Sequence, residues 1–134
     1  MNDQKLKSII SAHIDALLWS ETAENGDQFD AHYTARDVEA DTLVGLCSDC
    51  AAFLCKCEEE GLADFDELIL RRPDNDADGS AGHDFLLTRN GHGAGFWDGD
   101  WEESAGDKLT SIASSFPQVS LYLGDDGVLY GCSA

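Results

Sequence analysis

The apolar residues of positions 3–20 recur every three or four residues, and this spacing constrains the fold more than any other feature. One helix face would carry six of them together with a histidine: Leu6, Ile9, Ile10, His13, Ile14, Leu17 and Leu18. We therefore expect an amphipathic helix here. Because no second candidate ligand shares the face of His13, we interpret this residue as a histidine at the edge of the core rather than a metal ligand.

A second helix is predicted over residues 37–60. At 100° per residue, one third of its circumference would hold Leu43, Leu46, Cys50, Phe53, Leu54 and Cys57. Cys47 lies at the edge of this arc, and Cys55 points elsewhere. Zinc would need two further ligands beside the C-x-x-C spacing, so we expect these cysteines to pack as small apolar side chains. An odd total of five cysteines also disfavours the disulfide framework of a secreted protein.

The second half of the chain alternates strand and helix signals. A short helix over residues 62–72, ended by Pro73, precedes "HDFLLTRN" (83–90), which predicts a strand followed by an Asn90-Gly91 turn. Residues 91–101, which we name the glycine-rich arm, would return beside that strand. Residues 102–116 predict a helix, and "QVSLYLGDDGVLYG" (118–131) predicts a β-hairpin.

These elements predict one α+β domain over residues 1–134, with a mostly helical half (1–72) and a half made of strand, arm, helix and hairpin (73–134). We expect the N-terminal helices to pack on a small antiparallel sheet of about three to four strands, which includes the C-terminal β-hairpin.

The segment "DNDADG" matches the first half of a calcium-binding loop through Asp74, Asp76 and Asp78. The second half does not match, because the twelfth position is Phe85 instead of a bidentate glutamate. We therefore expect an acidic loop, with no cofactor and no firm metal site.

Charge restricts the partners of this chain. Its 27 acidic residues against 8 basic ones give a net charge of −19, which repels nucleic acids and anionic membranes and attracts basic grooves. No apolar run reaches the length of a membrane span, and the N-terminus lacks the apolar core of a signal peptide. We expect a cytoplasmic protein with no direct nucleic-acid or membrane partner, although acidity can also serve solubility alone.

The stretch "GHDFLLTRNGHGAGFWDGDW" (82–101) combines histidines, aspartates and aromatic residues with five glycines. It lacks the G-K-[ST] ending of a P-loop and the βαβ context of a dinucleotide site. Three interpretations stay open. The favoured one is a structural hairpin, the second is a binding surface, and the third is an acid–base or metal cluster formed by His83, Asp84, His92 and Asp98.

This stretch, together with "GDKLTSIASSF" and "LYLGDDGVLYG", resembles a family of small acidic proteins of phages and prophages whose function is unassigned. "IDALLWSET" and "HYTARD" are similar to the N-terminal half of that family, so the resemblance covers most of the chain. The chain departs from it at Leu86, where an aromatic residue is common, at Gly99, where a basic residue is common, and in its cysteines. The resemblance implies a viral accessory protein in the cytoplasm of an infected or lysogenic bacterium, and it assigns no catalytic residue.

Our leading hypothesis is a non-enzymatic inhibitor, of the anti-restriction or anti-CRISPR type, that imitates the charge of nucleic acid and binds a basic host protein. The alternatives are a small metal-dependent enzyme or binder at the histidine–aspartate cluster, and a phage assembly or accessory domain. The oligomeric state stays open. The acidic binding surface would include Glu21, Glu24, Asp27, Asp30, Asp37, Glu39, Asp41, Glu58, Glu59, Glu60, Asp98, Asp100, Glu102 and Glu103.

Overall fold

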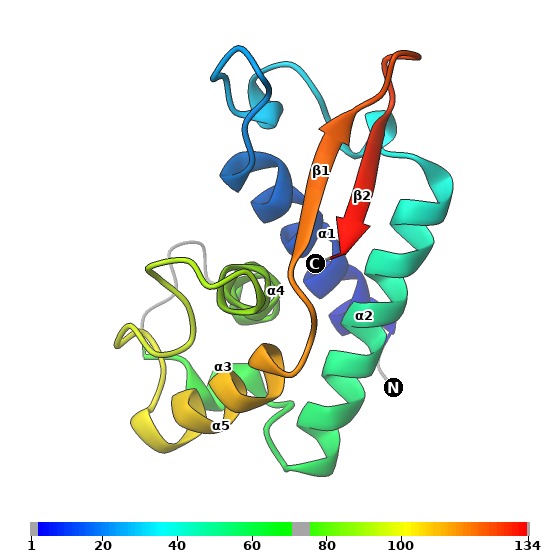
Figure 1. Cartoon of the computed structure of the whole chain (residues 1–134). Helices are drawn as coiled ribbons and strands as arrows, with labels where there is room; N and C mark the ends of the chain where they lie inside the picture. Colours follow the sequence, from blue (N-terminus) through cyan, green and yellow to red (C-terminus); the bar gives the residue numbers. More distant parts are fainter. Residues whose placement is uncertain (1–2, 71–75, 134) are drawn as a thin grey trace.

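A computed structural model describes residues 3–70 and 76–133, which form a mostly helical structure with one β-hairpin (Figure 1). The α-helices and strands are α1 (Asp3–Ser20), α2 (Ala40–Glu59), α3 (Phe65–Leu68), α4 (Ala77–Arg89), α5 (Glu103–Ser114), β1 (Val119–Leu123) and β2 (Leu129–Ser133). Two short 3-10 helices, η1 (Phe29–Ala31) and η2 (Ala35–Asp37), interrupt the loop between α1 and α2. The predicted α+β character is thus confirmed in coarse form.

The predicted sheet of three to four strands is wrong. The described residues form one two-stranded antiparallel sheet, in which Tyr122 pairs with Tyr130 and Leu123 with Leu129. The predicted hairpin is confirmed, and its β2 extends to Ser133. Leu129 of β2 also forms an isolated parallel bridge with Val38, a residue that lies shortly before α2.

The predicted strand over residues 83–90 is also wrong, because these residues belong to α4. Asp76 caps the start of this helix by accepting a hydrogen bond from the Gly79 amide (2.9 Å). At the other end, Gly91 has a φ of +71°, and its N–H donates to the Thr88 carbonyl while the His92 N–H donates to that of Leu87. This pattern is a Schellman motif. Asn90-Gly91 is therefore the end of a helix and not a hairpin turn.

The position of α4 explains why its sequence lacks helical periodicity. Figure 1 shows this helix end-on, between α1, α5 and the hairpin, and most of its side chains are buried. A helix that is enclosed on several sides carries apolar residues around most of its circumference, so a one-face pattern does not arise. In the sequence alone, the apolar run "FLL" (85–87) therefore resembles part of a buried strand.

Helices α1 and α4 approach each other closely at Gly82. A Cβ atom at this position would collide with the backbone carbonyl of Ile9, so only glycine fits the contact without displacement. The fully buried His13 lies in the same interface, with Nδ1 3.1 Å from the Gly82 carbonyl oxygen. Since a carbonyl can only accept, Nδ1 donates this hydrogen bond.

Arg89, at the end of α4, connects His13 to two other parts of the fold. Its Nη1 lies 3.4 Å from His13 Nε2, its Nη2 is 2.9 Å from Asp49 Oδ2 in α2, and its Nε donates to the Pro117 carbonyl (2.9 Å). Burial and the nearby guanidinium lower the pKa of His13 to about 3. The imidazole is thus neutral, and it accepts from Arg89 at Nε2.

The predicted apolar faces of α1 and α2 are confirmed, because they are the faces that the two helices bury. His13 lies deeper than the predicted core edge, with 0% exposure. In α2, Cys50 and Cys57 are buried, Cys47 is half-buried and Cys55 is exposed. All five cysteines are free thiols, and burial raises the pKa of Cys50 and of Cys57.

The glycine-rich arm is held to the body by two aromatic side chains. Phe96 and Trp101 are buried, whereas Trp97 is 54% exposed. The Thr88 hydroxyl accepts from the Phe96 amide (3.3 Å), and Trp101 forms an isolated antiparallel bridge with Ile69. The arm therefore lies against the outer side of α4 as an irregular loop and not as a strand.

Gly82→Ala should lower the free energy of unfolding by about 2–4 kcal/mol, because the added methyl group forces α1 and α4 apart. Urea unfolding followed by circular dichroism measures this loss. Gly45→Ala is the matched control. Gly45 is exposed in α2, and a Cβ atom there would have no other atom within 4 Å, so alanine should stabilise by about 0.5–1 kcal/mol. Equal effects of the two substitutions would contradict the close α1–α4 contact.

Candidate functional site

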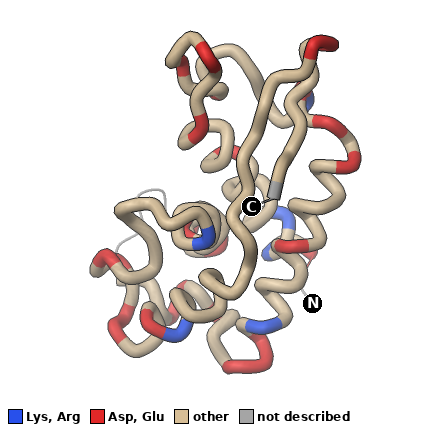
Figure 2. The backbone as a smooth tube through the Cα atoms, viewed as in Figure 1, with Lys and Arg blue, Asp and Glu red and all other residues tan. Residues whose placement is uncertain are grey.

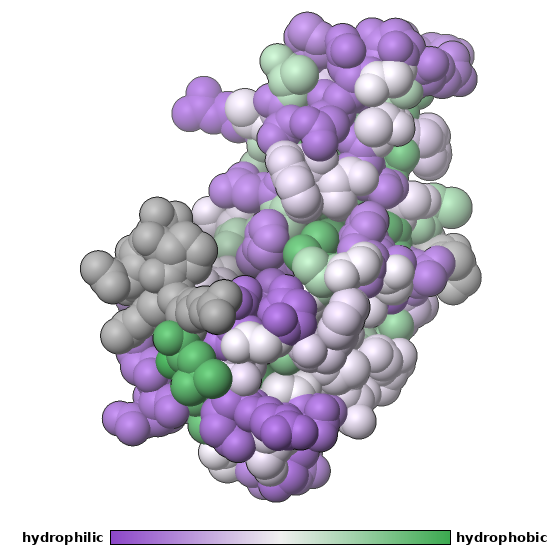
Figure 3. All heavy atoms as spheres, turned by 90° about the vertical axis from the view of Figure 1, so that its left-hand side faces the viewer, coloured by the Kyte–Doolittle hydropathy of each residue, from purple (hydrophilic) through white to green (hydrophobic). Residues whose placement is uncertain are grey.

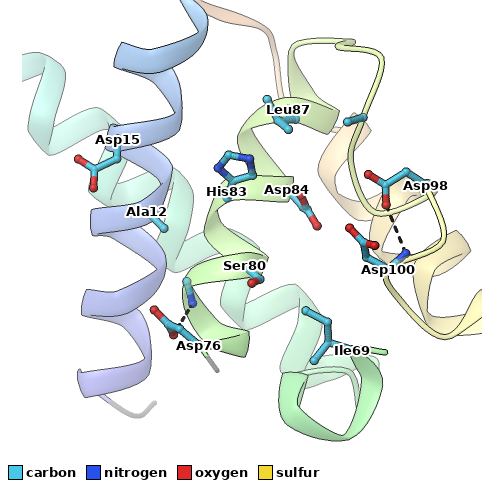
Figure 4. Close-up of a pocket in the computed structure, with 12 residues that line it drawn as sticks. Ala12, Asp15, Ile69, Asp76, Ser80, His83, Asp84, Leu87, Asp98 and Asp100 are labelled. Carbon is cyan, nitrogen blue, oxygen red and sulfur yellow. Dashed lines mark hydrogen bonds between the residues drawn. The ribbon is translucent and has the colours of Figure 1, made fainter. Parts of the chain in front are cut away.

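A pocket of about 450 Å³ opens between α1, α4 and the glycine-rich arm (Figure 4). Helix α1 contributes Ala12 and Asp15, and the end of the arm contributes Asp98 and Asp100. The remaining lining residues come mainly from α4 and are Ile69, Asp76, Gly79, Ser80, His83, Asp84, Leu87 and Ala94. Five of the lining residues are aspartates, so we name this cavity the acid-lined pocket.

Asp84 is the most unusual residue of the pocket, because it is a carboxylic acid with only 8% exposure. Its Oδ2 accepts a hydrogen bond from the Trp101 indole N–H at 2.7 Å. Figure 4 shows its side chain directed at the arm, where Asp98 and Asp100 lie opposite. Burial raises the pKa of Asp84 to about 6, the indole hydrogen bond opposes this shift, and the two neighbouring aspartates add to it.

His83 lies next to Asp84 in the sequence and faces the α1 side of the pocket. Its ring centroid is 5.9 Å from that of Trp19, a residue of α1 that is 46% exposed. Burial lowers the pKa of His83, while the negative charge of Asp98 opposes this change. The imidazole is therefore mostly neutral at pH 7 and adds no positive charge to the pocket.

Local hydrogen bonds fix the Asp98 carboxylate of the arm. Asp98 accepts from the amides of Gly95 and Asp100, each at 3.3 Å. Gly95 has a φ of +156°, and a side chain at this position would collide with the Thr88 hydroxyl. Glycine is thus required where the arm folds back over α4, and this turn places both carboxylates at the pocket.

The five aspartates give the acid-lined pocket a negative charge that would attract a cation. No ion pair among the described residues involves any of the five pocket aspartates. In addition, the described residues contain no group of three or more His, Cys, Asp or Glu side chains close enough to hold a metal ion. The negative charge of the pocket is spread over several separated carboxylates.

The structure brings together three of the four residues of the predicted histidine–aspartate cluster. His83, Asp84 and Asp98 line the acid-lined pocket. His92 instead lines a separate cavity of about 150 Å³ with Glu21, and its Nε2 is buried without a hydrogen-bond partner in the part of the chain that the structure describes.

The residues of the predicted calcium loop have other roles where the structure describes them. Asp76 caps α4, and Asp78 forms an ion pair with Lys5 (2.9 Å). Asp74 lies outside the described residues.

The predicted acidic binding residues lie mainly at the two ends of the molecule (Figure 2). One end carries the loop between α1 and α2 with the hairpin turn, and holds Glu21, Glu24, Asp27, Asp30, Asp37, Glu39 and Asp41. The other end carries the end of α2, the arm and the start of α5, and holds Glu58, Glu59, Glu60, Asp98, Asp100, Glu102 and Glu103.

Some of these acids also stabilise the local backbone. Glu21 accepts from the Leu121 amide, Asp37 completes a capping box with Thr34, and Glu102 caps α5. The residues without such bonds are freer to contact a partner. Figure 3 shows that the side of the molecule at the left of Figure 1 is largely hydrophilic, with scattered hydrophobic patches.

Sequence reasoning missed Asp15 and Trp19 as residues around a site. A helical wheel places Ala12, Asp15 and Trp19 on one side of α1. This signal becomes useful only when α4 is recognised as the helix that packs beside them.

Comparisons of this chain with models of protein families, with curated proteins and with solved structures give no match. No helix within residues 3–70 and 76–133 has both the length and the apolar character needed to cross a membrane.

Asp84→Asn should stabilise the protein at neutral pH. The folded-state pKa of about 6 lies above the ordinary value of 3.8, so stability is fully present below pH 3.8 and is lost as the pH rises through 6. Asparagine removes this loss and still accepts from the Trp101 indole, so the free energy of unfolding at pH 7.5 should rise by about 1–3 kcal/mol.

The difference between wild type and variant should nearly vanish at pH 4. Thermal melts at both pH values measure it, and taking the difference removes the opposing acid sensitivity of His13, which both proteins share. Glu24→Gln, at an exposed position, controls for the loss of one negative charge. A lower stability of Asp84→Asn at pH 7.5 would contradict the raised pKa.

Proposed function

We propose that this chain is an acidic interaction protein that occupies the nucleic-acid site of a basic host protein, with its carboxylates in place of phosphates. The observation that carries the proposal is that basic and acidic side chains lie in different places in the fold. Three of the basic residues make contacts within the molecule, whereas most of the acidic residues of the described chain are exposed.

The engaged basic residues make specific contacts. Arg89 is buried and pairs with Asp49, and Lys5 pairs with Asp78. The Lys56 ammonium lies 4.9 Å from the centroid of the Phe116 ring and donates to the Ser115 hydroxyl. These contacts reduce the positive charge that the surface offers to a partner.

The carboxylates are distributed in the opposite way. Asp84 is the one buried carboxylate among the described residues, and most of the others are exposed. They gather at both ends of the molecule (Figure 2). A DNA duplex carries about one negative charge per 1.7 Å of its axis, so a protein that imitates it needs a wide negative surface rather than one charged spot. The spread of acids over several elements supports this requirement.

The resemblance to phage and prophage proteins supports an action in the cytoplasm of a bacterium. A host defence protein that handles nucleic acid, such as a restriction or CRISPR component, presents the basic cleft that this surface complements. Anti-restriction and anti-CRISPR action place the same charge requirement on this chain.

A tagged full-length chain should capture a nucleic-acid-binding protein from bacterial extract at low salt, and the complex should weaken about tenfold or more between roughly 50 and 300 mM salt. Duplex DNA or RNA should displace the captured protein, because the two ligands share one site. Capture that resists both salt and nucleic acid would contradict the proposal, as would self-association of the chain with no basic partner. The latter result would favour a phage assembly role.

A second candidate is a small enzyme or metal-dependent binder at the acid-lined pocket. It is favoured by the pKa of about 6 of Asp84 beside the neutral His83, because groups that exchange protons near neutral pH suit acid–base chemistry. Thermal melts with millimolar calcium or zinc distinguish the two functions. Our main proposal predicts no change in Tm, whereas saturable stabilisation that Asp98→Asn abolishes would favour the second candidate.

A further inference from the structure

The acid-lined pocket is a candidate site for recognition of a basic side chain of the partner. We infer that this pocket receives an arginine side chain of the partner protein, held between the pocket carboxylates and the exposed face of Trp19. The inference rests on the proposed function, since it specifies the chemistry of the partner at one site.

Among the described residues, no basic side chain forms an ion pair with the carboxylates of the pocket. Asp84 is almost completely buried, and its hydrogen-bond partner among the described residues is a neutral indole N–H. Asp98 and Asp100 face it from the arm (Figure 4). Carboxylates that approach one another without a cation destabilise the isolated protein, and this cost is removed when a cation enters between them.

The rim of the pocket is aromatic, which supports the inference independently of charge. Trp19 lies exposed beside the pocket with its ring against His83 (5.9 Å between centroids, 38° between planes). Two further exposed apolar side chains, Trp97 and Leu70, flank Asp98 and Asp100: Trp97 directly precedes Asp98, and the Leu70 amide donates to the Asp100 carbonyl (2.6 Å). Exposed tryptophans beside a cavity are typical of binding hot spots.

Arginine fits this combination better than lysine. A guanidinium is planar, stacks on an indole ring and presents five N–H donors that can reach several carboxylates at once. An ammonium group is compact and strongly hydrated, and it serves fewer separated acceptors. A cavity of about 450 Å³ accommodates the guanidinium and its alkyl stem, which would contact Leu87 and Ala94.

The test uses the full-length protein and three short capped peptides that differ at one central residue, which is arginine, lysine or citrulline. Citrulline has the shape of arginine without its charge. Nitrogen-15 NMR titration follows the indole N–H signals of Trp19, Trp97 and Trp101. We expect saturable shifts with arginine, an affinity at least about threefold lower with lysine, and no saturation with citrulline.

Two matched double variants locate the effect. Asp98→Asn with Asp100→Asn should weaken arginine-peptide binding about tenfold. Asp107→Asn with Asp125→Asn removes the same charge from exposed positions that lie outside the acid-lined pocket and outside the predicted acidic binding surface, and should leave the affinity within about twofold. An equal loss in both double variants, or saturable binding of citrulline, would overturn the inference.

The same variants separate this inference from the proposed function. If the captured host protein still binds the Asp98→Asn, Asp100→Asn variant with wild-type affinity, and nucleic acid still displaces it, the proposed function stands and the arginine pocket is wrong. If no nucleic-acid-binding partner is captured although the arginine peptide binds at the pocket, the proposed function is wrong and the pocket stands.

Discussion

The contact between α1 and α4 at Gly82 is the constraint on which the rest of the structure depends. Without a side chain at this glycine, the Ile9 carbonyl and the α4 backbone lie next to each other, and His13 reaches the Gly82 carbonyl. Arg89 then binds His13 from the end of the same helix and extends the connection to α2 through Asp49. Helix α4 is fixed by backbone contact at its middle and by a buried guanidinium at its end.

This fixed helix determines what the surface can present. His83 and Asp84 of α4 line the acid-lined pocket, and the glycine-rich arm, which follows the Schellman motif at Gly91, adds Asp98 and Asp100. An acid is kept buried there with a raised pKa, which lowers the stability of the isolated protein at neutral pH. No ion pair among the described residues compensates this acid, and titratable groups with strongly perturbed pKa values are candidates for functional sites.

The sequence predicted the elements whose periodicity reflects one buried face. The faces of α1 and α2, including the different exposures of Cys50 and Cys55, followed from helix geometry, and the hairpin followed from its alternating residues and its Gly-Asp-Asp-Gly turn. Helix α4 could not be recognised in this way, because burial on several sides erases the pattern. The misassignment of α4 then produced a sheet that was too large.

The site was predictable only in part for the same reason. The sequence suggested that His83 and its neighbour Asp84 belong to one cluster, and that Asp98 of the arm joins them. A strand at 83–90 could not show that Trp19 of α1 lies beside His83, because that contact depends on two packed helices. The position of His92 away from the pocket follows from the helix end at Asn90, which turns the chain toward the hairpin.

In our proposal, the acidic surface around this pocket enters the nucleic-acid site of a basic partner. Hydrogen–deuterium exchange on the purified complex with the captured host protein tests this most directly, because it maps both sides of the interface. We expect slower exchange in the arm and near Trp19, together with protection of the nucleic-acid site of the partner. Protection confined to the other acidic residues would contradict only the arginine pocket, whereas a partner footprint away from its nucleic-acid site would contradict the proposed function.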